Sequence, residues 1–403
     1  MAYEIEEAKK LVVEAGKKLI ETGLIARTWG NVSARISETQ FVITPSGRAY
    51  ETLTPDDIVV VNIDDCSYEG DIKPSSEKGV HAAAYRHHPT VDFVIHTHQK
   101  YATIVSITGM EIRNVYSDLQ PVLGDKVPVA DYAMSTTESL RKKVETCIMM
   151  NPSARAIMLM HHGTLCMGDS YEHAFKIAGA LETCCERVIK DNYLRHSWAK
   201  SYSDEDKRNY FLKKEDCGAM PASICDLGSS VRNGNMFTLT VGDQTYDVDM
   251  ETCLAVNGVA PKCAKIHKAI YENQDVSIIK HLTEPDVVAV SCTDMRPMID
   301  DFAQIVGVDV KNCSWIDGDT DDCAAKIGKA AAGRNAVLIA GNGALAFGNS
   351  DGDMQALEII MDKGCEAVVD VDIFNRPHYV PKAECFLMRT VYLAKYSKEI
   401  NKK

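Results

Sequence analysis

The sequence lacks the features that mark redox, membrane and nucleic-acid-binding proteins. None of its 14 cysteines forms a C-x2-C pair, and no apolar run approaches the roughly 18 residues that span a bilayer. Basic residues are outnumbered, 44 against 57, and the net charge of −13 disfavours nonspecific attraction to nucleic acid or to an anionic membrane. A small anionic substrate stays compatible with this charge, because backbone N–H groups and a metal ion can hold it.

The N-terminus also lacks the basic start of a signal peptide, since residues 3–7 are YEIEE. We therefore expect a cytoplasmic protein whose scattered cysteines are reduced, buried thiols. With 45% hydrophobic and 25% charged residues, the chain can bury a full core. Dividing 403 residues by a typical domain of roughly 150 predicts two or three domains, or one large α/β domain.

Apolar residues recur at both helical and strand periods in the first half of the chain. Spacings of three and four residues predict helices, and alternation predicts strands. The predicted helices span 3–22, 75–88 and 171–195, and the predicted strands span 40–43, 58–63, 91–98 and 156–160.

Two blocks of the sequence recur, which predicts a tandem duplication. The block HHGTLCMGDS recurs 180 residues later as GNGALAFGNS, with Gly163 falling on Gly343. An upstream block recurs 185 to 186 residues later, with His81 falling on His267. The stretch between the copies is rich in charge, serine and glycine, so we predict two α/β units, 1–215 and 216–403.

Histidines stand at the ends of two of the predicted strands. Residues two apart on a strand point to the same side, so His96 and His98 project together and can clamp a metal ion from two points. A third ligand can come from His161 or His162, which alternation alone leaves equally eligible. Three imidazoles leave a coordination position open, as catalytic zinc sites do. The alternative is that these are structural histidines with satisfied hydrogen bonds.

A carboxylate and several small polar segments accompany the histidines. Glu77, at the start of a predicted helix, can serve as a fourth ligand or as a general base. The helix dipole alone also favours a glutamate there. Glycines, hydroxyls and a helix start suit a phosphate, although turn or capping roles explain each segment better when it is taken alone. Their joint occurrence beside the candidate metal ligands is what favours phosphate binding. These segments are Gly30-Asn31, Ser46-Gly47 and Ser75-Ser76.

Five segments in this order resemble the class II aldolase/adducin family: GLIARTWGNVSARI, FVITPSG, KPSSEKGVHAAAYRHHP, VIHTHQ and MLMHHGTLCMGDS. The resemblance extends over essentially all of residues 1–195. It implies a three-layer α/β/α sandwich around a largely antiparallel sheet, repeated here in tandem. It also implies rings of four subunits with active sites at the subunit contacts.

The resemblance assigns roles to individual residues. It makes His162, with His96 and His98, the ligand of a zinc ion, for which Mn²⁺ or Co²⁺ can substitute. It makes Glu77 the acid/base. A tyrosine of a neighbouring subunit can protonate the aldehyde oxygen in this family, and Tyr116 lies one residue from the corresponding place. The phosphate-binding set it implies comprises Gly30, Asn31, Ser46, Gly47, Ser75 and Ser76.

The expected activity is reversible cleavage of a ketose 1-phosphate, a small phosphorylated sugar, into dihydroxyacetone phosphate and an aldehyde. Cleavage leaves an enediolate whose negative charge zinc stabilises as a Lewis acid. Other members of the family act as dehydratases, decarboxylases or 4-epimerases on sugar phosphates. Gln120 stands where the epimerases place an aspartate, which weakens the epimerase alternative.

The second copy differs from the first at the positions of the expected metal ligands and of the acid/base. His281 corresponds to His96, but Thr283 and Asn342 stand for His98 and His162, and Cys263 stands for Glu77. We therefore expect residues 216–403 to be non-catalytic. Our hypothesis is that this copy replaces a neighbouring subunit, so that a homo-oligomer of two chains forms a pseudo-tetrameric ring. A different class, an adducin-like assembly module without catalysis, suits the second copy better than the first.

Overall fold

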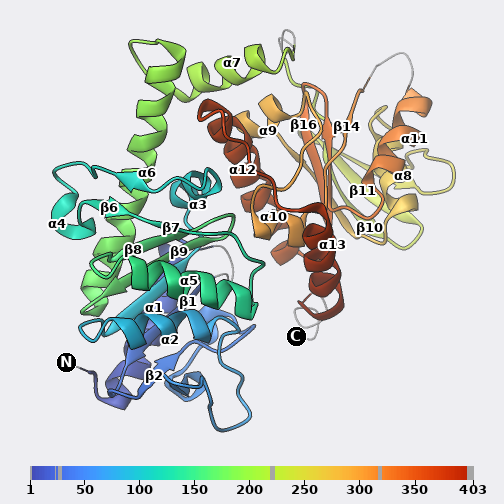
Figure 1. The fold of residues 1–403 in the computed structure, drawn as a ribbon. Helices are drawn as coiled ribbons and strands as arrows, with labels where there is room; N and C mark the ends of the chain where they lie inside the picture. Colours follow the sequence, from blue (N-terminus) through green and yellow to red (C-terminus); the bar gives the residue numbers. More distant parts are fainter. Residues whose placement is uncertain (1, 23, 26–29, 218–222, 316–319, 397–403) are drawn as a thin grey trace. The chain divides into compact units, whose positions relative to one another are not determined.

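The computed structural model describes residues 2–22, 24–25, 30–217, 223–315 and 320–396, and their contacts divide the chain into two compact units (Figure 1). Unit 1 extends to His196, and unit 2 begins at Ser197. The division lies before the position near 215 that the composition suggests. The reason is that helix α7 (Asp204–Lys214) packs on α12 (Asp351–Ile373), where buried Lys207 pairs with buried Asp370 at 2.6 Å.

Unit 1 is a mixed α/β unit. Its elements are α1 (Ile5–Glu21), β1 (Gly30–Arg35), β2 (Gln40–Ile43), β3 (Val59–Asn62), α2 (Lys78–His87), β4 (Phe93–Thr97), α3 (Lys100–Ile107), β5 (Ile112–Arg113), α4 (Gln120–Leu123), β6 (Lys126–Val127), β7 (Val129–Ala130), α5 (Glu138–Met150), β8 (Ala156–Leu159), β9 (Gly163–Gly168) and α6 (Tyr171–Ser197). The predicted helices and strands lie within about three residues of α1, α2, α6, β2, β3, β4 and β8.

Seven strands form the sheet of unit 1, in the order β3-β2-β1-β4-β9-β8-β7. Neighbouring strands are antiparallel except for β7 and β8, which are parallel. The sheet is therefore mixed, which corrects the expectation of a largely antiparallel sheet. A parallel pair needs a crossover, and α5 provides it between β7 and β8.

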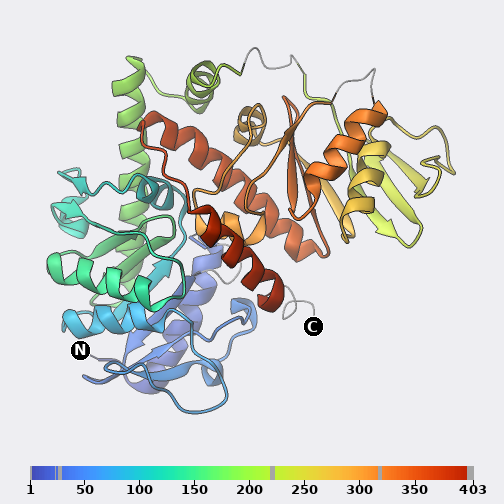
Figure 2. The same cartoon turned by 45° about the vertical axis from the view of Figure 1, so that its right-hand side comes forward.

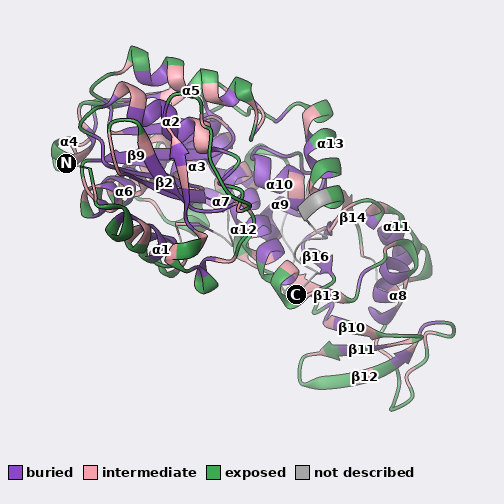
Figure 3. Cartoon of the chain, turned by 90° about the horizontal axis from the view of Figure 1, so that it is seen from below, coloured by how far each residue is buried: buried purple, intermediate pink, exposed green. Residues whose placement is uncertain are grey.

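Helices pack on both faces of this sheet, and the strands between them are buried (Figure 3). On one face, α2 and α5 share a hydrophobic core with alternate strand residues such as Val94 of β4. On the other face, Phe93 of β4 contacts Tyr171 at the start of α6, with ring centroids 5.4 Å apart. Because side chains alternate along β4, His96 lies on the same side of the strand as Val94, toward α2.

Unit 2 repeats this architecture. Its elements are α7, β10 (Ser229–Asn233), β11 (Met236–Val241), β12 (Gln244–Asp249), α8 (Ala264–Asn273), β13 (Ile278–Leu282), α9 (Pro285–Val290), α10 (Asp300–Ile305), β14 (Asn312–Cys313), α11 (Thr320–Ala331), β15 (Ala336–Ile339), β16 (Gly343–Gly348), α12 and α13 (Lys382–Val391). Its sheet has the order β12-β11-β10-β13-β16-β15-β14, the same as that of unit 1, which confirms the duplication. The long helix α12 packs against β13 and β16 (Figure 2).

The register of the strands matches between the two units. His96 of β4 lies opposite Leu165 of β9, and His281 of β13 lies opposite Leu345 of β16. The pairing of residues 96 and 281 in the sequence comparison is therefore a correspondence in space. It allows the two copies of each site residue to be compared directly.

Two further observations concern the cysteines and the membrane. Cys217 and Cys292, both in unit 2, are joined by a disulfide, so the expectation of reduced thiols is wrong for this pair. Two cysteines 75 residues apart in the sequence are brought together only by the fold, and no sequence spacing indicated them. Within the described ranges, no helix has both the length and the apolar character needed to cross a membrane.

Candidate metal centre and active site

Three histidines of unit 1 converge at the ends of β4 and β9. The ligand nitrogens of His96, His98 and His162 all lie within 4.8 Å of one another, and His96 and His162 are buried. His96 is the last residue but one of β4 in the middle of the sheet, His98 directly follows that strand, and His162 precedes β9, the neighbouring strand. The side chains that the sequence singles out as ligands are therefore brought together.

The backbone fixes the orientation of His96. Its Nδ1 lies 2.8 Å from the carbonyl oxygen of Thr164, and since a carbonyl only accepts, Nδ1 carries the proton. In a neutral imidazole the other nitrogen, Nε2, then presents a lone pair. That nitrogen lies 3.0 Å from Nε2 of His98 and 3.1 Å from a carboxylate oxygen of Glu77. Three imidazole nitrogens with a carboxylate beside them form a donor set that fits a divalent metal ion.

A tight turn selects which histidine faces the cluster. His161 has a left-handed backbone, with φ of 66°, and its ring packs edge-on against Tyr132 with centroids 5.1 Å apart. His162 then turns toward His96, and their rings stack with centroids 5.0 Å apart. Alternation along a strand could not decide between the two residues because both lie in the turn rather than in a strand.

Gly163 allows the two strands to approach at this point. A Cβ atom on Gly163 would lie 2.3 Å from the carbonyl oxygen of Thr97, and within 3.3 Å of ring carbons of both His98 and His96. Only a residue without a side chain leaves room for both the strand pairing and the imidazoles.

Glu77 lies against the histidine cluster. It is the residue before α2, is buried, and its two carboxylate oxygens lie 3.0 Å from Nε2 of His162 and 3.1 Å from Nε2 of His96. Burial alone raises the pKa of this carboxyl, but His162 and His96 in their protonated form outweigh burial and hold the pKa well below its usual value. The side chain is therefore a carboxylate that can ligate a metal or accept a proton.

The segments suggested for phosphate binding lie in two places. Asn31 of β1 pairs with His96 of β4, and its side-chain amide donates to Glu77 at 3.3 Å. Gly30 precedes it, and its carbonyl oxygen accepts a hydrogen bond from the buried Tyr50 hydroxyl at 2.5 Å. Both residues therefore lie on the strand beside the histidine cluster.

The two serine-containing loops run side by side. The amide of Ser46 donates to the carbonyl of Lys73 at 2.9 Å, and the amide of Ser75 donates to the carbonyl of Thr44 at 3.0 Å. Ser46-Gly47 and Ser75-Ser76 thus lie on adjacent segments, although about 30 residues separate them in the sequence. The Ser75 hydroxyl also accepts from the amide of Glu77 at 3.2 Å, which ties this loop to the acid.

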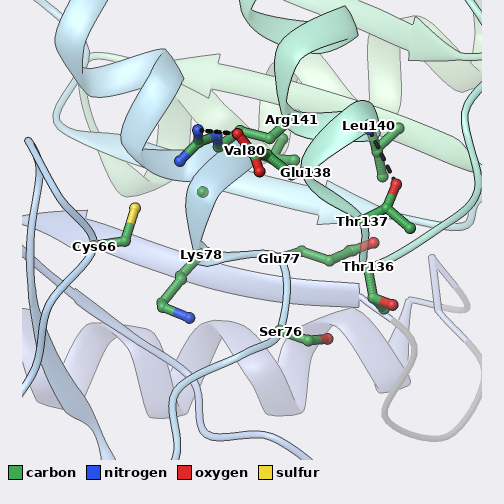
Figure 4. A pocket seen from close by; sticks show the side chains of 11 residues that line it. Cys66, Ser76, Glu77, Lys78, Val80, Thr136, Thr137, Glu138, Leu140 and Arg141 are labelled. Atoms are coloured by element: carbon green, nitrogen blue, oxygen red, sulfur yellow. Dashed lines mark hydrogen bonds and ion pairs between the residues drawn. The ribbon is translucent and has the colours of Figure 1, made fainter.

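A cavity of about 150 Å³ opens beside Glu77. Figure 4 shows the Glu77 side chain extending toward Thr136, with Ser76 nearby and the starts of α2 and α5 forming the walls. Lys78 and Arg141 also line it, and Arg141 pairs with Glu138 at 3.4 Å. The cavity is large enough for a few atoms of a small substrate next to the acid.

Tyr116 contacts a different group of side chains. Its hydroxyl donates to Asp191 of α6 at 2.6 Å, and the guanidinium of Arg187 lies 5.4 Å from its ring centre. Burial and then the hydrogen bond to Asp191 raise the pKa of this tyrosine. No contact found among the described residues joins Tyr116 to the histidines or to Glu77 of its own chain.

Sequence inspection missed the side chains behind Asn31. His81 of α2 hydrogen-bonds Asn31 and Ser33, and Ser33 also hydrogen-bonds Tyr85 at 2.7 Å. The duplication could have pointed to this histidine, because His81 recurs in the second copy as His267.

In unit 2 the corresponding position is closed by hydrogen bonds. His281 occupies the place of His96, and its Nε2 donates to the carbonyl of Asn342 at 2.6 Å. Its Nδ1 accepts from the amide of Leu227 at 3.3 Å, so backbone groups use both ring nitrogens. Cys263 precedes α8 as Glu77 precedes α2, and it offers no carboxylate.

The geometry and the comparison with known sequences agree. The sequence profile of the "Class II Aldolase and Adducin N-terminal domain" matches residues 10–189 and again residues 230–369. The chain belongs to the class II aldolase and adducin family. The two matched regions fall in the two units, as a tandem duplication requires, and members of this family typically depend on a divalent metal.

Curated relatives include enzymes of two activities. A 5-deoxy-D-ribulose 1-phosphate aldolase from Bacillus thuringiensis serovar kurstaki is 32% identical over 183 residues, which cover 45% of this chain and 84% of the relative. An L-ribulose-5-phosphate 4-epimerase from Salmonella paratyphi C is 43% identical over 109 residues, which cover 27% of this chain and 48% of the relative. Among solved structures, an L-fuculose 1-phosphate aldolase matches with a TM-score of 0.43 and 29% identity, covering 52% of this chain and 96% of that one.

Proposed function

We propose that this class II aldolase-family protein reversibly cleaves a ketose 1-phosphate into dihydroxyacetone phosphate and an aldehyde at a divalent-metal site in unit 1. The observation that carries the proposal is the contact of Glu77 with two members of the histidine cluster, which puts an acid/base beside a metal-binding position. The relative named as a 5-deoxyribulose 1-phosphate aldolase supports this reaction, because the match covers 84% of its length.

In this proposal His96, His98 and His162 hold the metal, with zinc as the first choice and Mn²⁺ or Co²⁺ as substitutes. A divalent ion bound there supplies Lewis-acid stabilisation of the negative charge that develops on the substrate as the carbon–carbon bond breaks. Thr164 keeps His96 in the tautomer that presents its Nε2.

Glu77 moves the proton. In the condensation direction its carboxylate, kept ionised by its neighbours, removes the proton from the nucleophilic carbon and becomes the neutral acid, and in the cleavage direction the neutral acid gives that proton back to the carbon. Tyr116 is proposed as the proton donor to the aldehyde oxygen in the site of a neighbouring subunit. Its raised pKa suits a group that is protonated at neutral pH.

The substrate phosphate is assigned to Gly30, Asn31 and the paired loops at Ser46-Gly47 and Ser75-Ser76. Backbone amides and hydroxyls bind an anion without adding positive charge, in keeping with the net charge of −13. The cavity beside Glu77 receives the other end of the sugar.

Unit 2 is proposed to be non-catalytic, with residues 216–403 carrying no metal site of this kind. We further propose that each unit is a three-layer α/β/α sandwich and that two chains associate into a pseudo-tetrameric ring with two metal sites. Sedimentation equilibrium tests the association, and a stable monomer at micromolar concentration would contradict it.

A second candidate is the 4-epimerisation of a pentulose 5-phosphate. The observation in its favour is the 43% identity to a named 4-epimerase over 109 residues. The two reactions separate cleanly, because epimerisation releases no triose phosphate.

The deciding experiment incubates the metal-loaded protein with a panel of ketose 1-phosphates, including 5-deoxyribulose 1-phosphate, and with L-ribulose 5-phosphate. Release of dihydroxyacetone phosphate, abolished by a chelator and restored by Zn²⁺, Mn²⁺ or Co²⁺, is expected from at least one ketose 1-phosphate. Formation of D-xylulose 5-phosphate without any triose phosphate would instead establish the epimerase. Chelator-insensitive release would contradict the metal site.

A further inference from the structure

A chain of buried hydrogen bonds leads from Glu77 into the core of unit 1. Asn31 donates to Glu77, and Asn31 Oδ1 contacts Nε2 of His81. Nδ1 of His81 lies 2.6 Å from the Ser33 hydroxyl, which lies 2.7 Å from the Tyr85 hydroxyl. The middle of this chain is fully enclosed, since His81 and Ser33 are both 0% exposed.

The direction of each bond follows from the acceptor at its end. A carboxylate oxygen only accepts, so the Asn31 amide nitrogen faces Glu77 and its carbonyl oxygen faces His81. That oxygen also only accepts, so Nε2 of His81 carries the proton. Burial keeps the ring neutral, and Nδ1 then accepts from Ser33, which in turn accepts from Tyr85. If the Asn31 amide rotated, its oxygen would face the carboxylate of Glu77.

Unit 2 contains the same inner group without the outer part. Ser230 lies 2.7 Å from Nδ1 of His267 and 2.8 Å from the hydroxyl of Tyr271, as Ser33 does from its partners in unit 1. Nε2 of His267, however, donates to the backbone carbonyl of Leu227 at 2.8 Å. The serine, histidine and tyrosine are therefore shared by both units, whereas the link to an acid occurs in unit 1.

We propose that His81 is a positioning residue for the active site: its Nε2–H group holds the Asn31 amide so that the amide nitrogen donates to Glu77 and fixes the carboxylate between His96 and His162. His267 makes the equivalent bond to a backbone carbonyl and so serves only the packing of its unit. The tests of this inference that measure activity rest on the proposed function of unit 1.

The test compares matched substitutions in the two units. His81→Leu removes both the donor and the acceptor, whereas the amide of His81→Gln can still donate to Asn31 and accept from Ser33. His267→Leu and His267→Gln are the controls, because they remove or replace the same ring within the same kind of core. All four full-length proteins are compared for metal content, melting temperature, kcat and KM.

With metal retained, His81→Leu is expected to lower kcat roughly 10–100-fold with little change in KM, the usual cost of losing a partner behind a metal site. His81→Gln should recover most of that loss. His267→Leu should lower the melting temperature comparably while leaving kcat unchanged. Equal kcat for His81→Leu and His267→Leu, or failure of His81→Gln to recover any activity, would overturn the proposal.

A second substitution covers the case in which His81→Leu does not fold. Ser33→Ala removes the hydroxyl that donates to Nδ1 and so weakens the fixation of the ring, and Ser230→Ala is its control. We expect Ser33→Ala to lower kcat several-fold at unchanged KM and Ser230→Ala to have no effect. Equal kcat in these two variants would also count against the proposal.

A readout without substrate separates this inference from the proposed function. Nitrogen-15 NMR of histidine-labelled protein should show one pair of resonances of the Nε2–H tautomer that is absent from His81→Gln. Finding His81 as the Nδ1–H tautomer would refute the positioning role whatever the activity. A correct tautomer in a protein that cleaves no sugar phosphate would refute the proposed function alone.

Discussion

Replacing Gly163 by alanine should damage both the stability of unit 1 and its metal site. The added Cβ would lie 2.3 Å from the carbonyl oxygen of Thr97, far inside van der Waals contact, so β4 and β9 must separate. It would also lie 3.2 Å from a ring carbon of His98 and 3.3 Å from one of His96. The same methyl group therefore presses on the backbone and on two proposed ligands.

The size of the effect follows from these contacts. Overpacking a well-packed interior costs about 1–3 kcal/mol, and a clash with a backbone atom in the middle of a sheet belongs at the upper end. For a unit of this size, about 3 kcal/mol lowers the melting temperature by roughly 6–12 °C. Displacing two imidazoles should weaken metal binding roughly 10–100-fold, as other disturbances behind metal ligands do.

Two other glycines provide controls. Gly343 is the counterpart in unit 2, where a Cβ would lie 2.1 Å from the carbonyl of Leu282, so Gly343→Ala should destabilise without changing metal affinity. Gly179 is exposed inside helix α6, with no atom near its Cβ position, so Gly179→Ala should stabilise by about 0.5–1 kcal/mol.

Differential scanning calorimetry measures the stability of each variant, and competition with a chelating dye measures its zinc affinity. The reasoning would be refuted if Gly163→Ala bound zinc as the wild type does, or if Gly343→Ala lost affinity to the same extent. A melting temperature of Gly163→Ala equal to that of the wild type would show that the strands are not held as closely as described.

Three further predictions concern the acid, the metal and pH. Glu77→Ala should retain metal and lower kcat roughly 10²–10⁴-fold in the triose phosphate assay, the range for a lost general acid/base. His98→Ala should lose metal by elemental analysis, whereas Thr283→Ala in unit 2 should not. Burial lowers the pKa of His81 to about 3 and that of His267 to about 4, below the unfolded value of 6.5. Their contribution to stability is therefore full above pH 6.5 and declines as the pH falls toward those values, by about 1.4 kcal/mol each at pH 5.5. Calorimetry from pH 7.5 to 5.5 should show a smaller decline for His267→Gln, and an unchanged decline would contradict the assignment.

The periodicity and the internal repeat were sufficient to predict the main helices and strands and the division into two similar units. The strand 40–43 coincides with β2, and the duplicated blocks became two sheets of identical strand order. Local spacing also indicated His96 and His98, because a strand fixes the relation of residues two apart.

Contacts between distant residues could not be anticipated in the same way. The choice of His162 over His161 depends on a turn with a left-handed residue, which alternation does not describe. The pairing of the loops at Ser46 and Ser75 depends on an isolated bridge between two prolines, Pro45 and Pro74. Such tertiary contacts leave no period in the sequence.

The hydrogen-bonded histidine of unit 2 has an evolutionary consequence. Three substitutions would restore the missing side chains, at Thr283, Asn342 and Cys263, yet His281 would still have both ring nitrogens engaged by backbone groups. Exchanging Asn342 would in addition remove the oxygen that accepts from the amide of Cys225. Restoring a site in this copy therefore takes several changes together, and the exchange of Asn342 breaks an existing bond before it creates a functional site. Forming a metal site in unit 2 would thus require the backbone contacts of His281 to break as well as three side chains to be replaced.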